Sequence, residues 1–245
     1  MLNILKRSND QKEVVSNQST NSTTDELILS IKDRINKKEI TKYDIECLLG
    51  IYLSITDKLP ISTFVVSGDR NNKDIIELSK VFLHYPKEEI KNLIEEILLS
   101  SPVGKWLMSI KGMQPTLAAE LIVRLNVDGK ECATQFLNYC GINNNTNYNQ
   151  QLKAVVDRLG FIFAEYNAND SLYHDLYKTR LDYEFTYNSD NVESLEHIYS
   201  KTRRWVEKIF ICHLFTEMYY AEYGTIPERR GNRTELDIPE VDYIK

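Results

Sequence analysis

The segment from Ser109 to Ala119 constrains the fold most, because it joins two helical patterns through a turn centred on Gly112. Glycine can adopt the positive φ that a tight turn between two helices requires. Pro115 suits the first position of the second helix, where a backbone N–H would have no partner inside the helix. The segment therefore predicts a helix-hairpin-helix over residues 103–126, with the backbone amides of the turn pointing outward.

Exposed amides followed by a helix N-terminus form a small cationic concavity that suits a phosphate group. A nucleic-acid backbone offers such groups without revealing its base sequence. The hairpin therefore predicts a phosphate contact made by five residues: Lys105, Lys111, Gly112, Gln114 and Thr116. An ordinary helical hairpin without a ligand is the alternative, since short patterns of this kind also occur by chance.

Helical periodicity runs through most of the chain and no convincing run of strands appears, which predicts an all-α, multi-helix protein. A capping box at Thr23-x-x-Glu26 opens the first helix, Thr41 offers a second cap, and the last helix, near 192–223, is long and lacks Pro and Gly. Other helices are expected near 74–85, 86–100, 129–140, 150–166 and 171–187, and a short apolar piece at 61–66. The sequence divides into a disordered arm (1–22), an N-terminal helical region (23–101), a helical domain with the hairpin (102–224) and an extended tail (225–245).

Composition limits the kinds of function that the chain can have. Hydrophobic residues make up 42% of the 245, which is enough for a core, while the net charge of −6 means that any nucleic-acid binding must use local basic patches. The scattered cysteines predict reduced core thiols: Cys47, Cys132, Cys140 and Cys212. The N-terminus has no signal-peptide pattern and no apolar run is long enough to span a bilayer, so we expect a cytoplasmic protein without membrane contact.

A basic stripe lies in the last expected helix, where Lys201, Arg204 and Lys208 recur at intervals of three and four and Arg203 flanks them. This spacing places the three on one helix face, and we expect them and Arg203 to assist the hairpin by binding nucleic-acid phosphates. The expected apolar face of the same helix consists of Ile198, Trp205, Ile209 and Cys212. A solvated face with ion pairs to residues such as Glu207 is the alternative interpretation. The tail adds a further basic cluster: Arg229, Arg230 and Arg233.

No motif supports enzymatic chemistry. The chain lacks a phosphate-binding glycine loop, a dinucleotide fingerprint and a serine-hydrolase elbow, so we predict no activity, no cofactor and no metal site. His213 and Glu217 have the i, i+4 spacing of a ligand pair, but without a third ligand we expect a partly buried, hydrogen-bonded histidine. The many tyrosines of the C-terminal half could stack on unpaired bases, although core and rim positions are the favoured interpretation.

From Trp106 to Gly224 the order of features resembles the C-terminal domain of the bridge-RNA-guided insertion-sequence transposases. The hairpin of that family reads apolar, Pro, Gly, apolar, Gly, Pro, followed by an Ala-rich helix. Here Lys111 replaces the first Pro and Gln114 the second Gly, and residues 135–142 look like the family's next aromatic segment. The closing helices of the family correspond in order to residues 152–155, 172–177 and 201–205.

The resemblance implies a DNA-engaging scaffold without the family's chemistry. The family pairs this domain with a RuvC-like nuclease domain, for which the first hundred residues here are too short and too helical. Its nucleophilic serine lies in a loop where this chain has Asn143 to Asn147 and offers only Thr146 as a hydroxyl. We therefore predict a non-catalytic, transposase-derived protein of a phage or mobile element that binds duplex or branched DNA.

A protein-interaction or structural module is the alternative function. In that case the hairpin is only architectural and the acidic surface contacts a protein partner, for example a host factor. The net charge of −6 supports this alternative.

Overall fold

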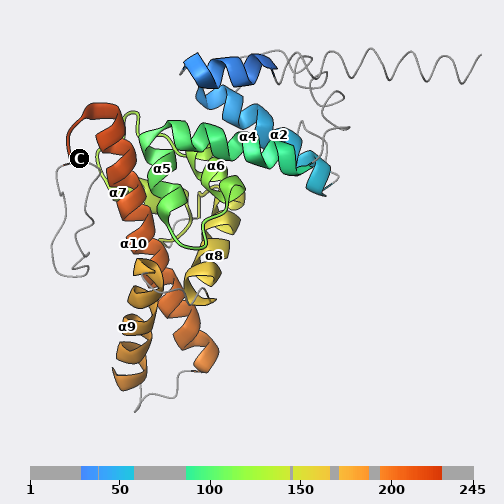
Figure 1. The fold of residues 1–245 in the computed structure, drawn as a ribbon. Helices are drawn as coiled ribbons and strands as arrows, with labels where there is room; N and C mark the ends of the chain where they lie inside the picture. Colours follow the sequence, from blue (N-terminus) through green and yellow to red (C-terminus); the bar gives the residue numbers. More distant parts are fainter. Residues whose placement is uncertain are drawn as a thin grey trace, which may run out of the picture. The chain divides into compact units, whose positions relative to one another are not determined.

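The computed structural model describes residues 29–37, 39–57, 87–143, 146–165, 171–187 and 194–227. Of these, 79% are helical and none lies in a strand, which confirms the predicted all-α class (Figure 1). Within the same ranges, no helix has both the length and the apolar composition of a membrane span. Outside them lie the predicted arm, the capping box at Thr23, the elements expected between 61 and 85, and the arginines of the tail.

The chain folds as two compact units, Met1–Ser100 and Ser101–Lys245. The first contains helical residues 29–37, α2 (Lys42–Asp57) and α4 (Lys87–Ser100), and α2 packs against α4. Thr41 precedes α2 as expected, but its hydroxyl does not accept an N–H from a described residue of the helix: its backbone N–H and its hydroxyl both donate to the Asp44 carboxylate, at 2.9 and 2.8 Å. Arg34 reaches the same buried carboxylate at 2.7 Å, which ties helical residues 29–37 to α2.

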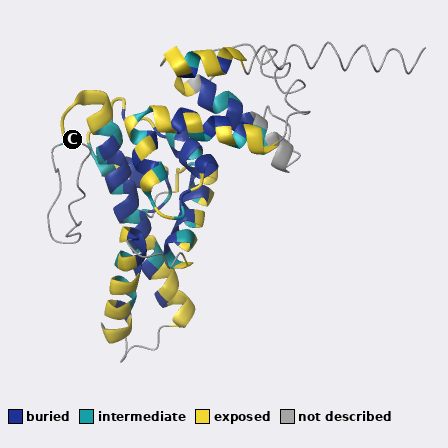
Figure 2. Ribbon diagram, in the orientation of Figure 1, coloured by how far each residue is buried: buried dark blue, intermediate teal, exposed yellow. Residues whose placement is uncertain are grey.

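In its described residues the second unit has six helices, five of them grouped with the long last one (Figure 1). They are α5 (Pro102–Ser109), α6 (Pro115–Arg124), α7 (Ala133–Tyr139), α8 (Gln150–Glu165), α9 (Leu172–Tyr187) and α10 (Leu195–Tyr223). The long final helix α10 packs against α5, α7, α8 and α9. Figure 2 shows the middle of α10 buried, whereas the adjoining ends of α9 and α10 are exposed.

The core of this unit is a set of aromatic rings centred on Phe210 of α10. Its ring stacks with Trp106 of α5 at 6.1 Å and contacts Phe163 of α8 and Tyr173 of α9 at 5.4 and 5.5 Å between centroids. Because each ring comes from a different helix, these contacts fix α5, α8 and α9 around α10. The cluster therefore sets which faces of α8, α9 and α10 remain outside the core.

The predicted helical hairpin is present between α5 and α6. Ser101 caps α5 by accepting the N–H of Gly104 at 3.0 Å, and Gly112 in the turn has a φ of 84°. Pro115 is the first residue of α6, and α6 ends at Arg124. The positive φ at position 112 is readily adopted by glycine, whereas a residue with a side chain would be strained there.

Candidate functional site

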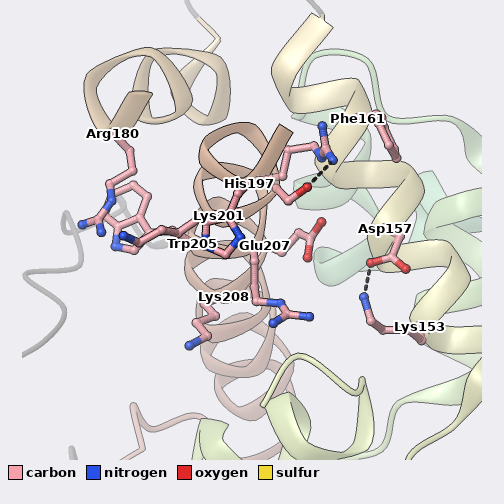
Figure 3. Close-up of a pocket in the computed structure, with 12 residues that line it drawn as sticks. Lys153, Asp157, Phe161, Arg180, His197, Lys201, Trp205, Glu207 and Lys208 are labelled. Carbon is pink, nitrogen blue, oxygen red and sulfur yellow. Dashed lines mark hydrogen bonds and ion pairs between the residues drawn. The ribbon is translucent and has the colours of Figure 1, made fainter. Parts of the chain in front are cut away.

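A basic pocket of about 750 Å³ lies on the outer face of α10, between this helix and side chains of α8 and α9 (Figure 3). We use "basic pocket" for its lining residues: Lys153, Asp157, Phe161, Arg180, His197, Ser200, Lys201, Arg203, Arg204, Trp205, Glu207 and Lys208. Six of these are lysine or arginine and two are carboxylates, in a chain whose net charge is −6. The pocket is therefore a local concentration of positive charge, and it contains the whole predicted stripe.

The local structure of α10 explains why the stripe faces outward. Ser194 caps the helix by accepting the N–H of His197 at 3.3 Å, and the helix then continues without interruption to Tyr223. Ile198, Val206 and Ile209 are buried, so the side of the helix that carries them is held against its neighbours. The stripe occupies positions of α10 that this burial leaves at the surface.

Three cations of the pocket are held by carboxylates. Glu184 of α9, whose side chain is only 1% exposed, pairs with Arg180 one turn earlier and with Lys201 of α10 at 2.9 Å. Lys153 pairs with Asp157 within α8. Lys201, predicted as a phosphate contact, thus joins α10 to α9 and is only partly available to a ligand.

The other three cations have no carboxylate within ion-pair distance in the part of the chain that the structure describes. Arg203 donates to the Ser200 hydroxyl at 3.2 Å, and its guanidinium lies 4.2 Å from the centre of the Phe161 ring. Arg204 and Lys208 form neither a hydrogen bond nor an ion pair with a described residue. These three side chains can bind an anion without first breaking an ion pair, which favours them over Lys153, Arg180 and Lys201.

Replacing Glu184 by Gln should destabilise the second unit by roughly 1–3 kcal/mol, because Arg180 and Lys201 would then lack their buried counter-charge. The value is below that for a fully buried pair, since both cations are partly exposed. Urea unfolding of the variant measures the loss. Asp182→Asn, an exposed position on the same helix, is the matched control and should leave the unfolding free energy unchanged.

Glu207 is not the surface partner that the alternative interpretation of the stripe required. Its side chain is 4% exposed and lies against Gly160 of α8, where an added Cβ would come within 2.1 Å of Oε1. Burial raises the pKa of Glu207 to about 7, and the nearby charges of Lys153 and Arg204 only partly offset this. The glycine thus allows a carboxyl group to be buried at the base of the pocket.

The hairpin residues lie apart from the pocket, since none of them lines it. Lys105, Lys111 and Gln114 are exposed and Gly112 is partly exposed, whereas Thr116 is buried. Within the described ranges, the backbone N–H groups of Lys111, Gly112 and Gln114 form no hydrogen bond. The accessible part of the predicted contact is therefore the turn itself with two lysines, and the stripe and hairpin are two separate surfaces.

The other side chains considered from the sequence are His213 and the four cysteines, and neither group forms a reactive site among the described residues. His213 is buried as predicted, with Nδ1 3.0 Å from the Tyr173 hydroxyl. Nowhere in the described segments do three His, Cys, Asp or Glu side chains gather as metal ligands. The four cysteines form no disulfide, and burial raises the pKa of Cys140 to about 12 and that of Cys212 to about 11. These two are therefore protonated thiols at neutral pH.

Sequence reasoning predicted four of the twelve lining residues, the stripe and Arg203, and missed the other eight. Lys153 and Phe161 of α8 and Arg180 of α9 have no local pattern that points to a shared site, although Arg180 has the i, i+4 spacing to Glu184 of an ion pair. Trp205 was expected on the apolar face of α10 but lines the pocket, where the Arg180 guanidinium lies 5.3 Å from its ring centre. Figure 3 shows Arg180 beside Trp205 on one side of α10 and Phe161, Asp157 and Lys153 on α8.

Comparison of the chain with protein-family models, with curated proteins and with solved structures finds no match. The likeness to the transposase C-terminal domain therefore stays a prediction from the sequence pattern. The function has to be argued from the pocket and the hairpin themselves.

Proposed function

We propose that this protein is a non-catalytic nucleic-acid-binding protein that binds DNA through its phosphate backbone. The observation that supports this proposal is the basic pocket, in which Arg203, Arg204 and Lys208 lack a carboxylate partner among the described residues. Phosphate oxygens are strong acceptors for such cations, and arginine can bind them through two parallel hydrogen bonds. A local cluster of this kind can attract DNA although the net charge of the chain is −6.

The turn between α5 and α6 is the second contact that we propose. Its unpaired amides at Lys111, Gly112 and Gln114 suit a phosphate, and Lys105 adds charge nearby on α5. Backbone contacts position DNA without reading bases, so binding should be weakly sequence-specific. The proposed ligand is duplex or branched DNA. We further propose that the protein is cytoplasmic and that it descends from a transposase of a phage or mobile element.

The salt dependence of binding tests the proposal. If Arg203, Arg204 and Lys208 each neutralise one duplex phosphate, the affinity should fall roughly 40-fold between about 50 and 200 mM salt. Fluorescence anisotropy with labelled duplex, branched and single-stranded DNA measures this. Binding that is absent from all three, or that does not respond to salt, would contradict the proposal.

A protein-interaction module is the second candidate, and exposed apolar side chains favour it. They gather near the adjoining ends of α9 and α10, where Phe185 and Tyr199 meet at 6.2 Å and Leu195 is 61% exposed. Such side chains are typical of protein contacts when they form a continuous patch. Co-purification of a stoichiometric protein partner without nucleic acid would support this candidate over DNA binding.

A further inference from the structure

The size of the basic pocket restricts which part of a nucleic acid can enter it. A volume of about 750 Å³ falls within the range of sites for small molecules, which enclose most of their ligand. A cavity of this size can hold one or two nucleotides that have left the helix stack, whereas a rigid duplex can place only its backbone phosphates against the exposed cations. Its lining must then contain groups that bind a base as well as groups that bind a phosphate.

Two aromatic rings line the pocket, and each is paired with an arginine. The Phe161 ring is 48% exposed, with the Arg203 guanidinium 4.2 Å from its centre. Trp205 is partly exposed, with Arg180 at 5.3 Å, and Arg180 also lies 4.7 Å from the ring of Tyr183. Aromatic rings and guanidinium planes are the surfaces on which unpaired bases stack.

The same lining provides for the phosphates. Arg204 and Lys208 of α10 line the pocket together with the two rings, and neither has a hydrogen bond or ion pair to a described residue. Cations combined with aromatic rings are the arrangement that binds single strands without base specificity. The tyrosines of the C-terminal half were candidates for stacking from the sequence, with core and rim positions as the favoured interpretation, whereas the aromatic side chains that line the pocket are Phe161 and Trp205.

We infer that the basic pocket binds unpaired nucleotides, such as those in a single strand or at a DNA branch, by stacking a base on Phe161 or Trp205 beside phosphates bound to Arg204 and Lys208. This inference rests on the proposed function and adds a preference for unpaired DNA at this surface. The hairpin remains a separate backbone contact.

An abasic strand separates stacking from charge, because it carries the same phosphates as oligothymidine of equal length and no bases. Wild-type protein should bind oligothymidine roughly tenfold or more tightly than the abasic strand, since each stacked base contributes a factor of about 5 to 150. Phe161→Leu should remove much of that ratio while leaving abasic binding unchanged. Phe185→Leu, at an exposed aromatic that does not line the pocket, should keep the wild-type ratio.

Fluorescence gives a second readout, because Trp205 lines the pocket and Trp106, the other tryptophan, is buried against Phe210. Oligothymidine should quench the Trp205 emission more than the abasic strand does. Thymidine monophosphate serves as a competitor, and displacement of the strand at concentrations comparable with the strand's own Kd would assign the pocket to a free nucleotide and overturn the inference.

The outcomes distinguish this inference from the proposed function. Equal, salt-sensitive binding of the thymidine and abasic strands would overturn the stacking site and leave backbone binding intact. If Phe161→Leu does not reduce the preference for oligothymidine and Trp205 is not quenched, then the bases do not stack in the basic pocket. Failure of every duplex, branched and single strand to bind would overturn the proposed function and the inference with it.

Discussion

The double variant Arg204→Glu/Lys208→Glu should bind DNA about 100-fold more weakly than wild type at low salt, roughly tenfold for each reversed charge. Both side chains line the basic pocket, and within the described residues neither is engaged in an ion pair. Their reversal therefore puts repulsion where we propose phosphates to bind and breaks no ion pair between described residues. The slope of log affinity against log salt should also become shallower by about 1.8, or 0.9 for each lost phosphate contact.

Lys201 is left unchanged in this variant for a structural reason. It pairs with Glu184 at 2.9 Å, so a glutamate there would face a buried carboxylate and destabilise the contact between α9 and α10. The matched control is Arg158→Glu/Lys178→Glu, which changes the net charge equally at exposed positions outside the pocket. An equal loss in both variants would show that overall charge, and no particular site, governs binding.

The hairpin can be tested separately, because its residues do not line the pocket. The double variant Lys105→Glu/Lys111→Glu should weaken duplex binding. If it still binds oligothymidine more tightly than the abasic strand by the wild-type ratio, the two surfaces act independently. Should the hairpin variant bind as wild type does, the turn is architectural, as the alternative interpretation of its sequence held.

Much of the fold could be predicted because its determinants are local. Glycine at 112 and proline at 115 specify the turn and the start of α6, and the structure has both features. The 29-residue helix α10 follows from apolar residues at helical spacing in a stretch without Pro or Gly. Such signals depend only on neighbouring residues, so they can be recognised without knowing what packs against the helix.

The candidate site could be predicted only in part, because long-range packing assembles it. The stripe of α10 follows from spacing, but its meeting with Arg180 and Phe161 depends on the aromatic contacts around Phe210. The same packing brings Lys201 to Glu184, seventeen positions earlier in the chain, and the two form an ion pair. Helical spacing does not indicate this pair. Charge patterns therefore identified cations that are capable of binding, but not which of them are already paired.

Replacing Glu207 by Gln should remove a loss of stability that wild type suffers as the pH rises from 5 to 8. Burial raises the pKa of Glu207 to about 7 from the ordinary value of 4.5, so the folded protein holds this proton more tightly than the unfolded chain does. Between these two values the native state binds more protons, and the free energy of unfolding therefore falls as pH rises. The contribution of Glu207 to this fall is about 3 kcal/mol, complete once the pH exceeds 7.

Urea unfolding at pH 5 and pH 8 measures the effect. From pH 5, where Glu207 is neutral in the folded protein, to pH 8, where it is ionised, the variant should gain roughly 2–3 kcal/mol of stability relative to wild type. Subtracting the variant from wild type removes the contributions of other groups, among them Glu217, whose pKa is also raised by burial. Parallel pH dependences of the two proteins would mean that Glu207 is ionised below pH 5 in the folded state.

The substitution Glu207→Gln should also change how the DNA affinity of the proposed site depends on pH. Above pH 7 the ionised Glu207 adds a negative charge to a pocket that also contains Asp157 on α8 and the cations Lys153, Arg203 and Arg204. DNA affinity of wild type should therefore weaken between pH 6 and 8, whereas Glu207→Gln should retain more of its affinity at pH 8. The charge-reversed variant at Arg204 and Lys208 provides the comparison, because its binding is weak at either pH. If wild type and Glu207→Gln lose affinity equally over this range, then the buried carboxyl group affects folding alone.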